Sequence, residues 1–342
     1  MRPTFHPRLV NGPFGDPALL VRLLGMGRNV FFDLGDLHDL PARPVLKATH
    51  AFVSHAHIDH FCGLDTLVRY SLGRRKTFRL VGPPGIADRV EGKLSGYTWN
   101  LVASYEEPFV LEVLEWSEGK ASTAALWHFP CQEEFRRQAG GIMALREEEI
   151  GIREVHRETG FRVLAARMNH QIASIAYAIE EPAHANVNRA ALDRLGLEPG
   201  PWVRTLKEAV LAGVPPETPI PLPSGKEAPL SALLEAGVIL VTQGQKLAYI
   251  ADCGWSHPEV ERAVSLVRGA HVLYCESAFL SEDADRARDR HHLTAAQAGE
   301  LARSAGVAEL RVFHFSPKYR DREQDFLHEA AEAFGGPVSL GP

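Results

Sequence analysis

Four side chains that commonly bind metal ions lie within six positions of this sequence: His55, His57, Asp59 and His60. They directly follow the apolar run AFVS, which is typical of a β-strand. His55 and His57 are two positions apart, so both imidazoles point the same way in an extended segment. Histidine is the commonest metal ligand. The spacing therefore predicts a metal site at the end of a strand.

The cluster favours two metal ions over one. A single tetrahedral zinc ion needs only three or four protein ligands, and Asp59 and His60 stand at an expected turn, away from the point that the first two histidines share. Two ions about 3.5–4 Å apart, as in dinuclear hydrolases, would use all four side chains. Further ligands must come from distant segments. Three candidates follow apolar strands: His170, Asp252 and His314. His128, in ALWHFPC, is an alternative to His170.

The elements that position these residues alternate between strands and helices. ALLVRLLGMGRNVFFDLGD predicts two strands with a Gly turn between them, and this stretch ends at Asp33 and Asp36. FRVLAARMNHQIASIAYAIEE predicts strands on both sides of His170. GVILVTQGQKLAYIADCGW predicts a hairpin ending at Asp252, AHVLYCESAFL a strand ending at Glu276, and ELRVFHFSP a last strand ending at His314. LTAAQAGELARSAG predicts a helix with Thr294 as its N-cap. Ligand-type residues should therefore meet at one edge of a sheet, where loops carry the chemistry.

Two regions show weaker patterns. Residues 106–160 are charge-rich without a clear strand pattern, and we treat them as a candidate insertion within one domain that spans residues 1–342. Residues 182–235 include the proline-rich stretch AGVPPETPIPLPSGKEAPL, for which we expect a short helix and then an irregular connection.

The composition is that of an ordinary globular protein, with 342 residues, 45% hydrophobic and 23% charged. The net charge of −6 excludes a generally basic nucleic-acid binder, while a local basic patch can still attract a polyanion. Four cysteines without C-x-x-C spacing suit a reducing compartment. The N-terminus lacks the apolar core of a signal peptide, and no apolar run reaches membrane-spanning length. We therefore expect a cytoplasmic protein without membrane association.

The motifs resemble those of a known superfamily. SHAHIDH is similar to the H-x-H-x-D-H signature of the metallo-β-lactamase superfamily. CESAFL, HHLTAAQAGELA and VFHFSPKY, in that order, resemble the ribonuclease Z branch, the tRNA 3′-end endonucleases. The resemblance implies an α/β (α+β) fold built as a four-layer αββα sandwich. Two mixed sheets would lie face to face, with helices outside and metals at one edge.

Carried over by position, the resemblance implies a centre of two Zn²⁺ ions, with Mn²⁺ or Fe²⁺ as alternatives. The implied ligands of one ion are His55, His57 and His170. The implied ligands of the second ion are Asp59, His60 and His314. Asp252 corresponds to a carboxylate that bridges the two ions.

The resemblance also suggests a reaction. A hydroxide held between two zinc ions would attack phosphorus in line, and Asp59 would orient it or take its proton. The leaving 3′ oxygen gains from a proton donor. His292 with Glu276 fits this role because a nearby carboxylate raises the pKa of an imidazole, and His291 is the alternative donor. Lys318 and Arg320, in SPKYRDR, are candidate contacts to the substrate backbone.

The expected function is that of a metal-dependent phosphodiesterase or endoribonuclease, acting in tRNA 3′-end processing on a tRNA precursor or on a small phosphodiester. The resemblance also allows a homodimer. The alternative is a small-molecule metallo-hydrolase of the same fold: a lactonase, thioesterase, β-lactamase or cyclic-nucleotide phosphodiesterase. Two departures bear on tRNA specificity. The early P-x-K-x-R-N-like loop has no clear counterpart in NGPFGDPALLVRLL, and LGLEPGPWVRTLK resembles only a segment beside the family's Gly- and Pro-rich arm.

Overall fold

The protein is described by a computed structural model that covers residues 4–116, 123–149 and 151–341. Its described residues pack as two compact units. The main unit is built from the chain up to Glu180 and from Gln245 onward, and the second unit is Glu181–Gly244. Within the single domain expected for residues 1–342, the structure therefore separates residues 181–244 from the rest as a second compact unit.

The main unit contains two eight-stranded sheets. The first sheet has its strands in chain order: β1 (Phe5–Leu9), β2 (Leu19–Leu23), β3 (Arg28–Phe32), β4 (Ala48–Phe52), β5 (Lys76–Gly82), β6 (Phe109–Trp116), β7 (Thr123–Pro130) and β8 (Gln138–Ala144). Strands β3 to β6 run parallel and the others antiparallel. Strands β3 and β4 are apolar along most of their length because both of their faces are buried.

The second sheet orders its strands as β20 (Val338–Leu340), β19 (Leu310–Phe313), β18 (Val272–Glu276), β17 (Lys246–Ile250), β12 (Ala173–Glu180), β11 (Phe161–Asn169), β10 (Ile152–Glu158) and β9 (Arg146–Glu149). Strands β17 to β20 run parallel, and β9 to β12 form an antiparallel meander joined to β17. Both sheets are therefore mixed, as expected.

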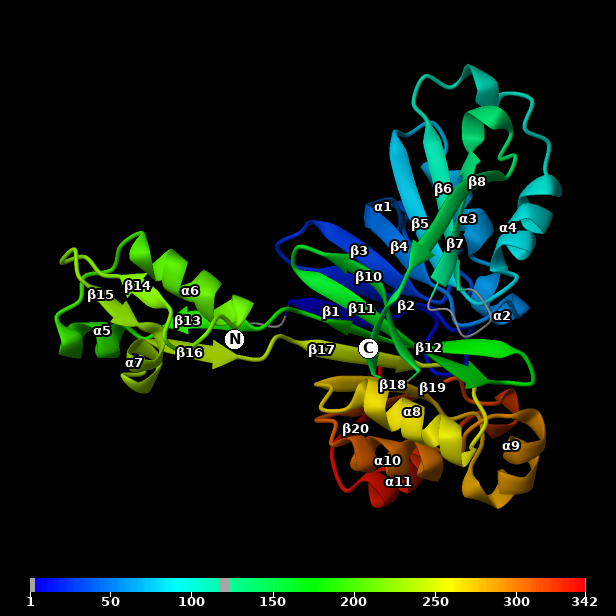
Figure 1. Ribbon diagram of the computed structural model, residues 1–342. Helices are drawn as coiled ribbons and strands as arrows, with labels where there is room; N and C mark the ends of the chain where they lie inside the picture. The colour runs from blue at the N-terminus through cyan, green and yellow to red at the C-terminus, as the bar shows by residue number, and fades with distance from the viewer. Residues whose placement is uncertain (1–3, 117–122, 150, 342) are drawn as a thin grey trace. The chain divides into compact units, whose positions relative to one another are not determined.

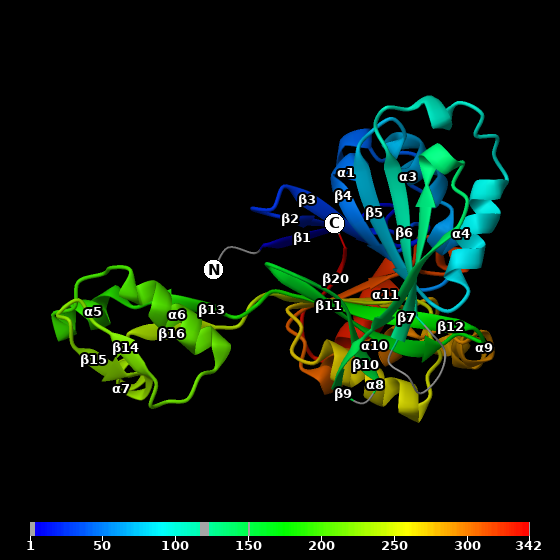
Figure 2. The same ribbon diagram turned by 45° about the horizontal axis from the view of Figure 1, so that its top comes forward.

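Helices cover the outer face of each sheet (Figures 1 and 2). The first sheet is covered by α1 (Ala42–Lys47), α3 (Leu64–Ser71) and α4 (Ile86–Ser95), and the second by α8 (His257–Val267), α10 (Ala295–Ala305) and α11 (Glu323–Phe334). Between the sheets lies an aromatic core that includes Phe32, Phe52, Tyr177, Tyr249 and Phe313. This arrangement confirms the four-layer αββα sandwich.

Local sequence explains several element boundaries. Helix α10 begins at a capping box, in which the Thr294 hydroxyl and the Gln297 side chain each bind the other residue's backbone N–H. The helix ends at Gly306, whose φ of 62° suits a residue without a Cβ. The N-cap predicted at Thr294 is therefore confirmed.

Two expectations about local structure are wrong. The predicted hairpin of residues 237–255 is two separate pairings: β16 (Ile239–Thr242) pairs with β13 (His184–Val187), and β17 pairs with β12 and β18. The expected irregular connection after residue 182 is instead the folded second unit. Its further elements are α5 (Arg189–Leu195), α6 (Trp202–Ala212), β14 (Pro219–Pro221), β15 (Glu227–Pro229) and α7 (Leu230–Glu235). They enclose a small core around Trp202, Leu206 and Val238. The many prolines of this stretch favoured an irregular connection and gave no sign of this core.

The candidate insertion at residues 106–160 supplies strands β6 to β10, which belong to both large sheets. Residues 117–122 and 150 of this segment lie outside the described residues. The sequence shows no clear strand pattern here because β8 and β9 are mostly exposed. Exposed strands can carry polar residues at most positions, so they lack the apolar alternation of a half-buried strand. The insertion itself stays a prediction. Within the described residues, no helix is both long and apolar enough to cross a membrane.

Candidate metal centre and active site

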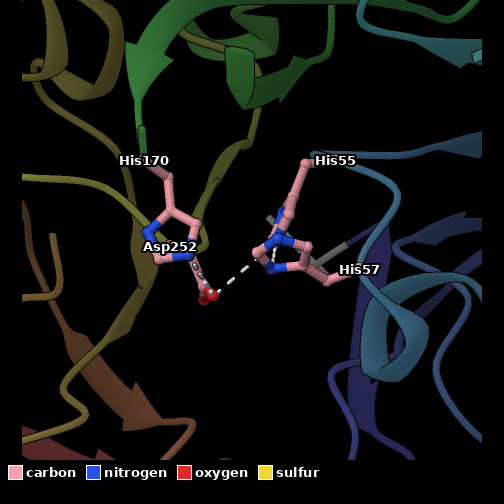
Figure 3. Close-up of side chains that lie close together, drawn as sticks. All are labelled: His55, His57, His170 and Asp252. Atoms are coloured by element: carbon pink, nitrogen blue, oxygen red, sulfur yellow. Dashed lines mark hydrogen bonds and ion pairs between the residues drawn. The ribbon is translucent and has the colours of Figure 1, made fainter. Parts of the chain in front are cut away.

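The ligand-type residues predicted from the sequence lie together at one edge of the sandwich, where several strands end. One group consists of His55, His57, His170 and Asp252, whose ligand atoms lie within 4.8 Å of one another. His55 and His57 follow β4, His170 stands in the turn between β11 and β12, and Asp252 follows β17. Figure 3 shows the two early histidines facing His170 and the Asp252 carboxylate.

A second group consists of Asp59, His60 and His314, again with ligand atoms within 4.8 Å of one another. Asp59 and His60 belong to α2 (Ile58–Phe61), the short helix after His57, and His314 follows β19. His314 has a φ of 65°, an unusual backbone conformation for a residue with a Cβ. Such conformations concentrate at functional sites, because the surrounding structure must hold them in place.

The carboxylate of Asp252 lies between the two groups. Its Oδ2 atom is 3.7 Å from His55 Nε2 and 3.5 Å from His170 Nε2. Its Oδ1 atom is 3.5 Å from His60 Nε2 and 2.8 Å from His314 Nδ1. Each oxygen of one buried carboxylate therefore faces a different set of imidazoles.

The donor atoms at this centre fit a divalent cation. His60 Nε2, Asp252 Oδ1 and His314 Nδ1 are buried and have no hydrogen-bond partner of good geometry among the described residues. Leaving a buried polar atom unpaired costs about 1–3 kcal/mol. Three such atoms converge here from three segments of the chain, and a metal ion that accepts their lone pairs removes that cost. Imidazole and carboxylate together suit zinc and related divalent metals.

Electrostatics adjusts the protonation of these ligands. Burial, with repulsion from His60, lowers the pKa of His55 to about 2, so its imidazole is neutral as a metal ligand must be. Burial disfavours the charged form of His314, but Asp252 outweighs it and raises the pKa of His314 to about 10. Burial also opposes ionisation of Asp252, yet His314 and His60 hold its pKa well below the usual range. A metal ion held by His314 would therefore have to displace a proton.

Asp33 supports the centre through hydrogen bonds, and it was not among the site residues predicted from the sequence. It is fully buried, and its Oδ2 accepts hydrogen bonds from His60 Nδ1, the Ser54 hydroxyl and the Tyr249 hydroxyl, each at 2.8 Å. Its Oδ1 accepts from the Ser54 backbone N–H at 2.6 Å. Because Asp33 engages His60 Nδ1, Nε2 is the ring nitrogen that faces the centre, 3.5 Å from Asp252 Oδ1. A signal was present in the sequence, since Asp33 directly follows the apolar strand β3.

His170 is oriented in a similar way. Its Nδ1 donates to the backbone carbonyl of His291 at 2.8 Å, which leaves Nε2 to face Asp252. The rival ligand, His128, lies in β7 with Nδ1 3.8 Å from Glu112 Oε1 and belongs to neither group.

His292 pairs with Glu276 beside the centre. His292 Nδ1 lies 3.1 Å from Glu276 Oε2 and 4.0 Å from Asp252 Oδ2. Glu276 is fully buried and also accepts the Cys253 backbone N–H at 3.0 Å. Burial lowers the pKa of His292, but the Glu276 carboxylate outweighs it, and the net shift is upward. His291 is the C-cap of helix α9 (Ala284–Arg290), with a φ of 54°, and contributes its backbone carbonyl to His170. Of these two histidines, His292 is the one with a carboxylate partner among the described residues.

Similarity to known proteins agrees with this geometry. The chain is 33% identical over 300 residues to a ribonuclease Z of Deinococcus radiodurans, an alignment that covers 87% of this chain and 84% of the relative. The chain belongs to the ribonuclease Z family. A ribonuclease Z of Porphyromonas gingivalis is 27% identical over 291 residues, covering 84% of this chain and 78% of the relative. No protein-family model matches the chain.

Solved structures agree on the fold. The crystal structure of human tRNase Z, short form (ELAC1), aligns with a TM-score of 0.54 at 16% identity, covering 99% of this chain and 95% of that one. The metallo-beta-lactamase fold protein YhfI from Bacillus subtilis aligns with a TM-score of 0.54 at 13% identity, covering 98% and 97%. The expected family and fold are thus confirmed. This member of the ribonuclease Z family is a metal-dependent hydrolase of the endoribonuclease class.

A cavity of about 630 Å³ opens over the centre of this ribonuclease Z family member. Residues of the centre that line it are His57, Asp59, His170, Asp252, His292 and His314. The two predicted substrate contacts stay predictions. Lys318, in the 3₁₀ turn η4 (Pro317–Tyr319), is paired with Asp283, and Arg320 is exposed; neither lines this cavity.

Proposed function

We propose that this protein is a tRNA 3′-end processing endoribonuclease whose active centre holds two divalent metal ions, Zn²⁺ in the first instance. One observation carries the two-ion proposal: the two oxygens of Asp252 face two separate ligand groups. In this proposal His55, His57 and His170 hold one ion. Asp59, His60 and His314 would hold the other, with the Asp252 carboxylate lying between the two groups. The tRNA substrate is inferred from relatives named ribonuclease Z.

The bound ions would lower the pKa of a water molecule toward neutrality and stabilise negative charge on a phosphoryl oxygen. In this proposal Asp59 orients the attacking water or accepts its proton. Its Oδ2 lies 3.3 Å from His314 Nε2 and 3.5 Å from His60 Nε2, while the side chain is 36% exposed and lines the cavity. One carboxylate oxygen can thus serve the centre while the other stays accessible from the cavity.

His292 is the proposed proton donor to the leaving group. Its Nδ1 is held by Glu276, which leaves Nε2 of a cavity-lining ring free for substrate. As water adds to phosphorus, the bond from phosphorus to the 3′ oxygen breaks and that oxygen takes the His292 proton. A positioned acid of this kind typically contributes about 10²–10⁴-fold to a rate.

A direct test compares substrates on the metal-loaded protein. A precursor tRNA with a 3′ trailer should be cleaved at the 3′ end of the tRNA body, and bis-p-nitrophenyl phosphate should be hydrolysed slowly. Turnover of a β-lactam or a thioester, with no cleavage of either phosphodiester, would instead establish the small-molecule alternative. The same RNA already carrying CCA measures end specificity, and metal analysis counts the bound ions. The cytoplasmic location and the homodimer stay predictions.

A further inference from the structure

The lining of the active-site cavity is acidic, although the proposed substrate is a polyanion. Four aspartates line it, and Asp59 and Asp252 belong to the metal centre. The other two, Asp16 and Asp289, stand at its walls. Among the described residues, Arg290 is the only arginine or lysine that lines this cavity. A nucleic-acid backbone in the cavity therefore meets one protein cation besides the metal centre.

The backbone around Arg290 is fixed to the metal centre. Arg290 is the last residue of α9, and the turn after it is held by the hydrogen bond from His170 Nδ1 to the His291 carbonyl at 2.8 Å. On the other side, Gln171 Nε2 donates to the Asp289 carbonyl at 3.3 Å. Figure 1 shows α9 beside the turn that joins β11 and β12. The same turn that carries His170 thus positions the backbone on both sides of Arg290.

The charge of Arg290 is available to a ligand. It has no ion pair or side-chain hydrogen bond within the described part of the chain, although its helix contains two other arginines that do have partners. Arg288 pairs with Asp285 at 2.9 Å, and the Arg286 guanidinium stands 5.9 Å from the Phe279 ring centroid. A guanidinium is always charged near neutral pH and binds phosphate oxygens through two parallel N–H groups.

We propose that Arg290 binds a phosphate of the RNA that adjoins the scissile phosphate, and so strengthens binding of a polynucleotide over a simple phosphodiester. The inference rests on the proposed function. Unlike Lys318 and Arg320, Arg290 lines the cavity over the centre. The scissile phosphate is left to the metal centre.

The test compares Arg290→Gln with Arg288→Gln, a matched control that removes the same charge from the same helix outside the cavity. Each metal-loaded protein is assayed on the precursor tRNA and on bis-p-nitrophenyl phosphate, which has a single phosphate. Arg290→Gln should raise KM for the RNA about 10-fold, since hydrogen bonds to charged groups are strong. The loss on RNA should exceed any loss on the small diester by about that factor. The slope of log KM against log salt should fall by about 0.7, the value for one contact to a single strand.

Arg290→Lys should recover part of the loss, because it keeps the charge without the planar fork. The inference is overturned if Arg290→Gln behaves like Arg288→Gln, or if both substrates lose equally. These results differ from a failure of the proposed function, in which the wild-type protein itself does not cleave the precursor tRNA. That last outcome would overturn both proposals.

Discussion

Replacing Asp33 by asparagine should weaken metal binding without disturbing the backbone. Asp33 has a φ of 56°, in the left-handed region that asparagine tolerates about as well as aspartate. The two side chains also have nearly the same volume. The substitution therefore removes one charge and one acceptor oxygen at the base of the centre, and it changes little else.

The magnitude follows from the hydrogen bonds at this carboxylate. Asparagine keeps one oxygen for the Ser54 N–H, but its NH₂ group replaces the Oδ2 atom that accepts from His60, Ser54 and Tyr249. The two hydroxyls can rotate and accept instead. His60 has no such choice: either its Nδ1–H stays unpaired, at about 1–3 kcal/mol, or the proton moves to Nε2 and blocks the ligand atom. Losing a partner that orients a ligand typically costs about 10–100-fold in metal affinity or activity.

The assay is competition for metal with a chelator of known affinity, followed by phosphodiesterase rates at rising metal concentration. Asp33→Asn should release metal at lower chelator concentration and recover activity in part when metal is in excess. Asp36→Asn is the control, because Asp36 is exposed in the loop after β3, and its side chain accepts only the His38 N–H among the described residues. If Asp33→Asn holds metal as tightly as the wild type, the argument about His60 orientation is wrong.

Three further outcomes follow from the structure. His292→Ala should lower kcat by about 10²–10⁴-fold while the number of bound metal ions, measured by elemental analysis, stays unchanged; loss of metal would instead make His292 a ligand. Prolonged dialysis against a chelator should abolish activity and lower the urea midpoint of unfolding, because the buried donor atoms of Asp252 and His314 lose the metal ion that they bind. Full activity after exhaustive metal removal would refute the metal centre. Burial and the nearby His156 lower the pKa of His50 from 6.5 to about 2, so the unfolded chain takes up a proton near pH 6.5 that the folded chain does not. The free energy of unfolding is therefore unaffected by His50 above pH 6.5 and falls by about 1.4 kcal/mol per pH unit below it. Urea unfolding of His50→Gln should depend less on pH between 7 and 5 than that of the wild type. Equal pH dependence would contradict the lowered pKa of His50.

The sequence pattern was sufficient to predict the structure where all the interacting groups lie within one short segment. The alternation around His55 and His57 follows from the two-residue period of an extended chain, and Thr294 caps α10 through groups three residues away. Apolar runs that end in Asp252, Glu276 and His314 correspond to β17, β18 and β19, whose parallel carboxyl ends meet at the same edge. Pattern failed at β16, because a turn between two apolar runs does not reveal whether they pair with each other.

The amino-acid sequence by itself determined which side chains are present, the order of the strands that carry most of them, and the family to which the chain belongs. Only the tertiary structure decided that Asp252 directs one oxygen to each ligand group and that Asp33 orients His60. It also decided that Lys318 has a partner, whereas Arg290 has none among the described residues. The physical reason is distance along the chain. Propensity, capping and periodicity act over a few residues, whereas coordination and charge pairing depend on atoms that packing of the two sheets brings within a few ångströms.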